Sequence, residues 1–131
     1  MSTEKSLSGI LVKDIMTKAL ISVDPGTSVF QVAKMMEQGG IGAILMKKDG
    51  TTSGIITDRD FAIKIATQKL PLETPVEKIA SSPLETINSS ESILEAAKQM
   101  SSKKIRKLAV VEDGKIVGII TSTDLVNQLA K

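Results

Sequence analysis

Residues 54–60 read GIITDRD, and residues 118–124 read GIITSTD. Each stretch begins with apolar residues typical of a strand, ends in Thr-x-x-Asp, and is followed by apolar residues at helical spacing. Thr-x-x-Asp is the pattern of a capping box, in which the threonine hydroxyl accepts the backbone N–H of the aspartate and the aspartate side chain accepts the backbone N–H of the threonine. The pattern therefore predicts a strand that turns directly into a helix, twice in one chain.

Such a turn also suits an anionic ligand. A helix that begins directly after a strand leaves free N–H groups and the positive end of its dipole at the turn. A phosphate group is stabilised at such a place. Helix capping alone would explain the same residues, and the two roles are compatible.

The composition narrows the class of protein. The chain has 131 residues, of which 41% are hydrophobic and only 2% aromatic, so we expect a compact fold with an aliphatic core. It contains no cysteine and no histidine. Disulfides, thiolate nucleophiles and the commonest general base are thereby excluded, and we predict a protein that is not an enzyme. The net charge of +2 is too small to indicate nucleic-acid binding.

The sequence also predicts a location. Residues 1–9 are polar and lack the apolar region of a signal peptide. No run approaches the length of a membrane span. We therefore expect a cytoplasmic protein without membrane association.

Periodicity and turn residues predict the elements of the first half. We expect two short elements, a helical turn at 11–17 and a strand at 20–23. A helix capped by Thr27 or Ser28 should then end at Gly39-Gly40. A hairpin of two strands, at 41–46 and 52–56, and a helix to about residue 67 complete this half.

The second half repeats the first. Residues 68–75 contain two prolines and predict a linker, with Thr74 as the cap and Pro75 as the first residue of a short helix. Val12 then corresponds to Val76 and Gly54 to Gly118, a constant offset of 64 residues without a gap. We interpret the chain as a tandem duplication of residues 1–70 and 71–131.

The doubled Gly-h-h-Thr-x-x-Asp (h, hydrophobic), with Asp14-Ile15-Met16-Thr17 and the strand that leads to Asp49-Gly50, resembles a tandem pair of CBS domains, the cystathionine β-synthase regulatory module. The resemblance covers about residues 11–130. It implies an α+β fold of β-α-β-β-α repeats packed as a pseudo-twofold pair. It also implies a cleft for AMP, ADP or ATP, with S-adenosyl compounds a less favoured ligand and no cofactor or metal. In similar proteins two such modules form a disc-like homodimer, and the module regulates a partner protein, here unknown.

The resemblance implies that each acidic turn works with the first strand of the other repeat. Asp60 and Asp124 suit the two hydroxyls of a ribose, because an ionised carboxylate accepts both. The further candidate nucleotide-binding residues fall into two sets. Those placed with Asp60 are Thr57, Arg59, Ser82, Pro83, Leu84 and Arg106, and those placed with Asp124 are Thr17, Lys18, Ala19, Leu20, Thr121 and Thr123.

Two features set the repeats apart from each other or from the family. Position 42 is Gly and position 106 is Arg, so we expect the Asp60 cleft to be the better phosphate site, with Arg106 as its cation. Where relatives often have a proline in the second strand, this chain has Leu45 and Ala109. The extra N–H at these positions should not break the fold.

Two alternatives to a nucleotide sensor remain open. The chain could be a structural homodimerisation module with unoccupied clefts. It could also bind nucleic acid weakly through Lys103-Lys104-Ile105-Arg106-Lys107, but this cluster is short and lacks aromatic residues for base stacking. Cations near a helix C-terminus need no ligand to explain them.

Overall fold

The computed structural model describes residues 8–18, 20–81 and 85–131 of the chain. The chain divides into two compact units. One contains the described residues between positions 21 and 84, and the other combines the described residues up to Leu20 with Glu85–Lys131. Each unit carries one three-stranded sheet, and the two are described in turn.

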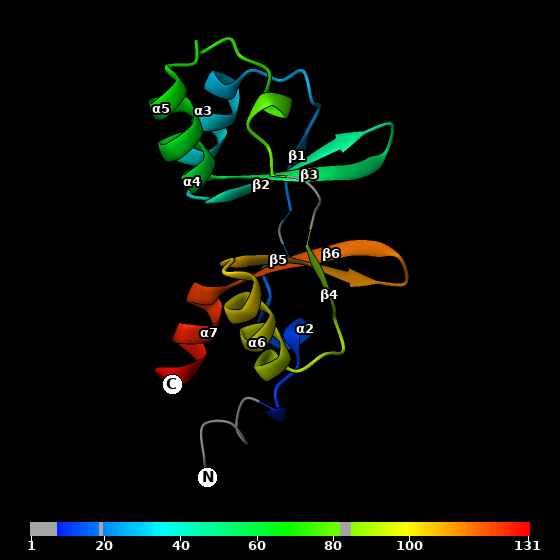
Figure 1. Cartoon of the computed structure of the whole chain (residues 1–131). Helices are drawn as coiled ribbons and strands as arrows, with labels where there is room; N and C mark the ends of the chain where they lie inside the picture. Colours follow the sequence, from blue (N-terminus) through cyan, green and yellow to red (C-terminus); the bar gives the residue numbers. More distant parts are fainter. Residues whose placement is uncertain (1–7, 19, 82–84) are drawn as a thin grey trace. The chain divides into compact units, whose positions relative to one another are not determined.

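The unit of residues 21–84 has the strand order β1-β2-β3, and we call it the β1–β3 unit. Its strands are β1 (Ser22–Val23), β2 (Ala43–Lys48) and β3 (Thr51–Thr57). β1 pairs with β2 in parallel, and β2 and β3 form an antiparallel hairpin. Helix α3 (Val29–Gly39) connects β1 to β2 and lies on the same face of the sheet as the helices that follow β3 (Figure 1).

The predicted start and stop signals act as expected in this unit. The Ser28 hydroxyl accepts a backbone N–H of the first turn of α3 at 3.1 Å. Gly40 ends the helix in the left-handed conformation, with φ of 62°. Asp49 and Gly50 form the hairpin turn with φ of 53° and 78°, two successive positive values that match the right-handed twist of the strands.

The helix predicted after residue 57 is present but not uniform. Helix α4 (Asp58–Asp60) continues as the π-helical turn η1 (Phe61–Ile65) and then as α5 (Ala66–Gln68). A π turn accommodates an additional residue, which a 3.6-residue apolar pattern does not detect. The equivalent helix of the second repeat, α7 (Ser122–Leu129), is α-helical throughout. The same repeat position therefore carries two different helices.

The other unit has the strand order β4-β5-β6 and is called the β4–β6 unit. Its strands are β4 (Thr86–Asn88), β5 (Lys107–Glu112) and β6 (Lys115–Thr121). The pairing repeats that of the β1–β3 unit, parallel between β4 and β5 and antiparallel between β5 and β6. Helices α6 (Ile93–Lys103) and α7 lie on one face of this sheet (Figure 1).

The first segment of the chain packs with the sheet of the second repeat. Helix α2 (Val12–Ile15) precedes β1 in sequence but belongs to the β4–β6 unit. The Val12 N–H donates to the Glu91 carbonyl at 2.8 Å, and Thr17 exchanges two backbone hydrogen bonds with Ile119 of β6, at 2.8 and 3.0 Å.

The corresponding segment of the second repeat packs with the sheet of the first. The 3₁₀ turn η2 (Val76–Lys78) belongs to the β1–β3 unit, where the Val76 N–H donates to the Thr27 carbonyl at 2.8 Å. Ser81 pairs with Ile55 of β3 in the same way that Thr17 pairs with Ile119. The compact units therefore do not coincide with repeats 1–70 and 71–131, because each repeat contributes its first segment to the other unit.

The cap predicted at Thr74 is wrong. Pro75, in an extended conformation with φ of −64° and ψ of 140°, is the residue that precedes η2, so the turn begins at Val76. The Thr74 hydroxyl donates instead to the Pro71 carbonyl at 2.6 Å. The Pro71 carbonyl also accepts the Thr74 N–H, at 3.1 Å, and this local turn competes with the capping role.

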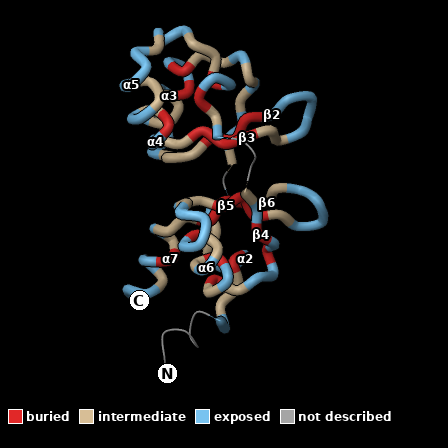
Figure 2. Tube along the Cα trace, viewed as in Figure 1, coloured by how far each residue is buried: buried red, intermediate tan, exposed pale blue. Residues whose placement is uncertain are grey.

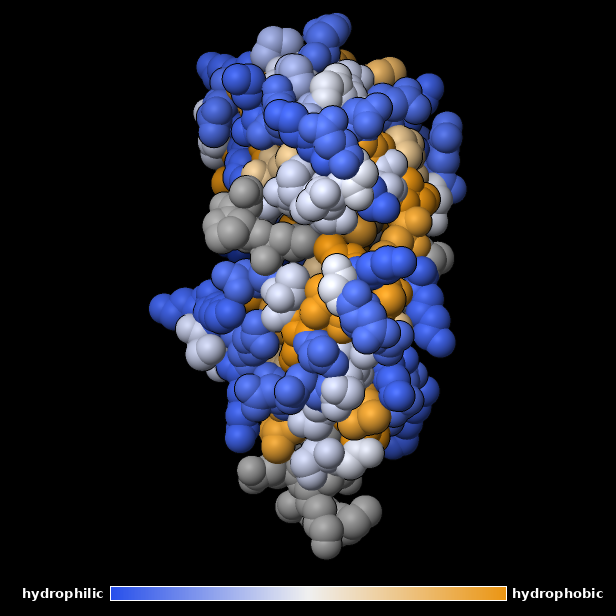
Figure 3. Space-filling model, turned by 90° about the vertical axis from the view of Figure 1, so that its right-hand side faces the viewer, coloured by the Kyte–Doolittle hydropathy of each residue, from blue (hydrophilic) through white to orange (hydrophobic). Residues whose placement is uncertain are grey.

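Each unit has its own core of aliphatic residues, as the composition predicts. Buried positions lie on the strands and on the inner sides of the helices (Figure 2), while hydrophilic residues cover much of the face in Figure 3. The buried core residues of the β1–β3 unit are Val29, Val32, Ile44, Met46, Ile56, Val76 and Ile79. Those of the β4–β6 unit are Val12, Ile87, Ile93, Ala96, Met100, Leu108, Val110, Ile120 and Leu125.

Candidate ligand-binding turns

The turn from β3 into α4 is a complete capping box, as predicted. The Thr57 N–H donates to Oδ2 of Asp60 at 2.8 Å, and the Asp60 N–H donates to the Thr57 hydroxyl at 3.3 Å. The Thr57 hydroxyl also donates to Oδ2 of Asp60, at 3.1 Å. The Asp60 carboxylate is thereby held at the junction of strand and helix, where Asp60 is 6% exposed.

Two further groups bind the other carboxylate oxygen of Asp60. The Lys64 ammonium lies 3.1 Å from Oδ1, and the Ser81 hydroxyl donates to Oδ1 at 3.3 Å. Lys64 also donates to the Ile79 carbonyl at 2.7 Å. Lys64 and Ser81 therefore tie the segment that follows η2 to the start of the helix.

The turn from β6 into α7 is the second predicted capping box. The Thr121 N–H donates to Oδ2 of Asp124 at 2.8 Å, and the Asp124 N–H donates to the Thr121 hydroxyl at 3.1 Å. Within the part of the chain that the structure describes, Oδ1 of Asp124 has no hydrogen-bond or ion-pair partner. The repeat equivalents of Lys64 and Ser81 are Gln128 and Thr17.

The glycines of the two motifs allow a backbone segment to approach each turn. A β-carbon on Gly54 would lie 3.0 Å from the Ser81 carbonyl oxygen, and one on Gly118 would lie 2.9 Å from the Thr17 carbonyl oxygen. A side chain at either position would therefore collide with the backbone of the approaching segment. The approaching segments lead directly to positions 82–84 and 18–20, the stretches predicted to work with Asp60 and Asp124.

The remaining predicted site residues differ in accessibility. Thr57, Thr121 and Leu20 are partly buried. Thr17, Lys18, Arg59, Arg106 and Thr123 are exposed, so their side chains are available to a ligand. The predictions for Ala19, Ser82, Pro83 and Leu84 concern positions outside the described residues.

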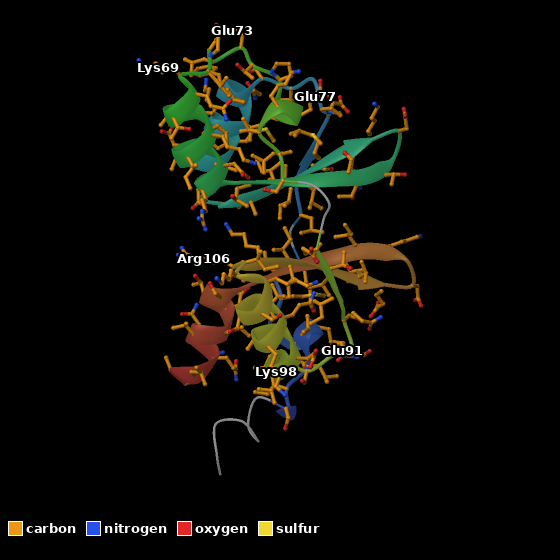
Figure 4. The ribbon with its side chains drawn as sticks, viewed as in Figure 1. Lys69, Glu73, Glu77, Glu91, Lys98 and Arg106 are labelled. Atoms are coloured by element: carbon orange, nitrogen blue, oxygen red, sulfur yellow. The ribbon has the colours of Figure 1, made fainter. Side chains whose placement is uncertain are left out.

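Arg106 directly precedes β5 and lies beside the first residue of α7. Its carbonyl accepts the Ser122 N–H at 2.9 Å, and Figure 4 shows it at the end of the sheet from which α7 begins. Within the β4–β6 unit it is therefore close in structure to the Asp124 turn. The predicted pairing of Arg106 with Asp60 involves the two different units and stays a prediction.

Sequence reasoning missed two residues that bind Asp60. Lys64 follows Asp60 by four residues, the spacing at which side chains of opposite charge meet on a helix, so this partner could have been found. Ser81 is distant in sequence and carries no local signal. Its contact depends on the transfer of the η2 segment to the β1–β3 unit.

The described residues contain no group of three or more acidic side chains placed to hold a metal ion. They also contain no helix with the length and apolar character needed to cross a bilayer.

The chain matches a known family in both halves. The CBS domain family model matches residues 12–67 and 76–131. The CBS domain-containing protein YhcV of Bacillus subtilis is 35% identical over 120 residues, which are 91% of this chain and 86% of YhcV. The protein MJ0450 of Methanocaldococcus jannaschii is 36% identical over 116 residues, and the match spans 86% of this chain and 62% of that protein.

Solved structures share the fold. An uncharacterized conserved protein from Pyrococcus horikoshii has a TM-score of 0.89 and 31% identity, with 95% of each chain covered. The CBS domain pair of protein MJ0100, solved in complex with 5′-methylthioadenosine and S-adenosyl-L-methionine, has a TM-score of 0.82 and 30% identity, with 92% of this chain and 95% of that chain covered. Two capping-box turns, two sheets of one topology and the family match over both repeats lead to one conclusion: the chain belongs to the CBS domain family and is an α+β tandem pair of CBS domains.

Proposed function

We propose that this CBS pair is a non-catalytic regulatory module that binds an adenine nucleotide and signals its presence to a partner protein. The observation that carries the proposal is the capping box that holds an aspartate carboxylate at each strand–helix junction. In both, a backbone N–H fixes one carboxylate oxygen at 2.8 Å, which presents the carboxylate at a strand–helix junction. A carboxylate held in this way is preorganised to accept the hydroxyl groups of a ribose.

The proposed ligand contains an adenosine group. AMP, ADP and ATP are the first candidates, and S-adenosyl compounds are the second. The complex of the MJ0100 domain pair with two adenosine-containing molecules supports this ligand class for a structurally similar chain. It does not distinguish a phosphate from a thioether or sulfonium group at the 5′ position, so all of these belong in the test.

The test is a calorimetric and thermal-shift panel of AMP, ADP, ATP, S-adenosylmethionine and 5′-methylthioadenosine. A ligand that binds only the folded chain should stabilise it by about 2.7 kcal/mol at a hundred times its dissociation constant. A flat response to every compound would reject the proposed ligand class. Hydrolysis of ATP by the purified protein at an enzymatic rate would reject the non-catalytic function.

The ribose assignment has its own test. 2′-Deoxy and 3′-deoxy analogues of the tightest ligand each remove one hydroxyl donor. Loss of a hydrogen bond to a charged group costs about 1.5–3 kcal/mol, so each analogue should bind about tenfold or more weakly than the parent. Equal binding of parent and deoxy compounds would show that neither carboxylate contacts the diol.

We also propose that the chain forms a homodimer. Val126 and Leu129 lie one helical turn apart on α7 and are 62% and 54% exposed, which leaves apolar surface that a second copy could cover. Sedimentation equilibrium of the wild-type chain and of Val126→Glu tests this. A monomeric wild type would contradict the proposed homodimer.

Salt-dependent binding to an oligonucleotide would instead favour the nucleic-acid alternative.

A further inference from the structure

The two acidic turns are equivalent in sequence but not in hydrogen bonding. An ionised carboxylate has about four lone-pair sites. At Asp60 four donors are present: the Thr57 N–H and hydroxyl on Oδ2, and the Ser81 hydroxyl and the Lys64 ammonium on Oδ1. The acceptor capacity of Asp60 is therefore filled by groups of the chain itself.

The equivalent carboxylate in the β4–β6 unit is largely unfilled. Oδ2 of Asp124 accepts the Thr121 N–H, and the described residues offer no donor to its Oδ1. One substitution between the repeats accounts for the missing cation, because Gln128 stands at the Lys64 position. Thr17, at the Ser81 position, keeps a hydroxyl group, but among the described residues this hydroxyl does not hydrogen-bond to Asp124.

A ligand could reach Oδ1 of Asp60 only by displacing Lys64. Its ammonium bridges Oδ1 of Asp60 and the Ile79 carbonyl, at 3.1 and 2.7 Å, and its side chain is 35% exposed beside a carboxylate that is nearly buried. A diol that approached Oδ1 would have to replace both a charged hydrogen bond and the contact that holds Ile79. At Oδ1 of Asp124 the described residues make no such bond that a ligand would have to replace.

We propose that the repeats have diverged into one binding turn and one locked turn. Asp124 is the carboxylate that binds the ribose, and Asp60 is closed by Lys64 and Ser81 and fastens the η2 segment to its helix. The chain consequently binds one adenosine-type ligand rather than two. This inference rests on the proposed function, because it assigns that function to one of the two turns.

The test uses AMP as the probe, calorimetric stoichiometry as the readout, and isosteric amide variants that keep the shape of each turn. Wild type should bind one AMP per chain. Asp124→Asn should weaken binding about tenfold or more, while Asp60→Asn should leave the affinity within about twofold of wild type. Lys64→Gln combined with Ser81→Ala should raise the stoichiometry toward two. Two equivalent sites in wild type, or loss of binding in Asp60→Asn with retention in Asp124→Asn, would overturn the assignment.

A ligand-free measurement separates this inference from the proposed function. Urea unfolding of Asp60→Asn, Lys64→Gln and the double variant should show coupling between the two positions, whereas the matched cycle of Asp124→Asn and Gln128→Ala should be additive. If AMP and the other adenosine compounds fail to bind wild type, the proposed function and the single binding turn fall together. The closure of Asp60 by Lys64 is still tested by the two double-mutant cycles. Equal coupling energies in both cycles would reject this closure.

Discussion

The Met16 side chain lies directly against Gly118, where a β-carbon would fall 2.5 Å from the methionine sulfur and 2.9 Å from the Thr17 carbonyl oxygen. We predict that Gly118→Ala lowers the free energy of unfolding by about 1–3 kcal/mol, the usual range for overpacking. Gly54→Ala is the matched control, because its nearest contact would be 3.0 Å, and it should cost less. Urea denaturation of both variants is the measurement, and equal losses would contradict the tighter packing at Gly118.

Substitutions at Val12 and Val76 test whether the first segment of each repeat packs on the sheet of the other repeat. Both side chains are 0% exposed, but Val12 lies in the core of the β4–β6 unit and Val76 in that of the β1–β3 unit. Each change to Ala should cost about 1.5–3 kcal/mol of stability. Hydrogen exchange should rise mainly in residues 86–131 for Val12→Ala and mainly in residues 21–68 for Val76→Ala. Faster hydrogen exchange mainly in the sheet of the mutated repeat would contradict the packing of each first segment on the sheet of the other repeat.

Lys104 and Gly40 end equivalent helices in the left-handed conformation, with φ of 56° and 62°. A lysine is strained in this conformation because of its β-carbon, and glycine is not. Lys104→Gly should therefore stabilise the protein by about 0.5–1 kcal/mol, and Gly40→Lys should destabilise it by a similar amount. Melting temperatures of the two variants should move in opposite directions. A loss of stability in Lys104→Gly would mean that the lysine makes a contact worth more than the strain.

Arg106 tests whether the second repeat supplies a cation for phosphate. Arg106→Ala should weaken AMP and ADP about tenfold while adenosine changes little, because a guanidinium binds phosphate with two charged hydrogen bonds. Lys98→Ala, an exposed cation on α6, serves as the control. Equal loss for adenosine, AMP and ADP, or no loss at all, would remove Arg106 from the site.

The local elements could be predicted because the residues that determine them are close in sequence. The capping boxes at Thr57 and Thr121 follow from a three-residue spacing, and the end of α3 follows from Gly40. The repeat offset of 64 residues also gave the common topology of both sheets. In each case one short pattern has one structural consequence.

Other features of the fold and of the candidate site depend on contacts between residues far apart in the chain. No local pattern predicts that Ser81 binds Asp60 or that Thr17 pairs with Ile119. The π turn after Asp60 escaped detection because its apolar residues also fit an α-helix. As a result, the two acidic turns looked equivalent in sequence although their carboxylates have different partners.

The placement of α2 and η2 means that neither repeat is complete by itself. A single repeat on its own would carry a first segment with no sheet to pack on and a sheet with no first segment. Two copies could complete each other by exchanging these segments, as in a domain-swapped dimer. Covalent fusion makes that encounter intramolecular and replaces a dependence on protein concentration by a high effective concentration set by the linker. The duplicated chain thus holds, within one molecule, contacts that two separate copies of a repeat would otherwise have to make with each other.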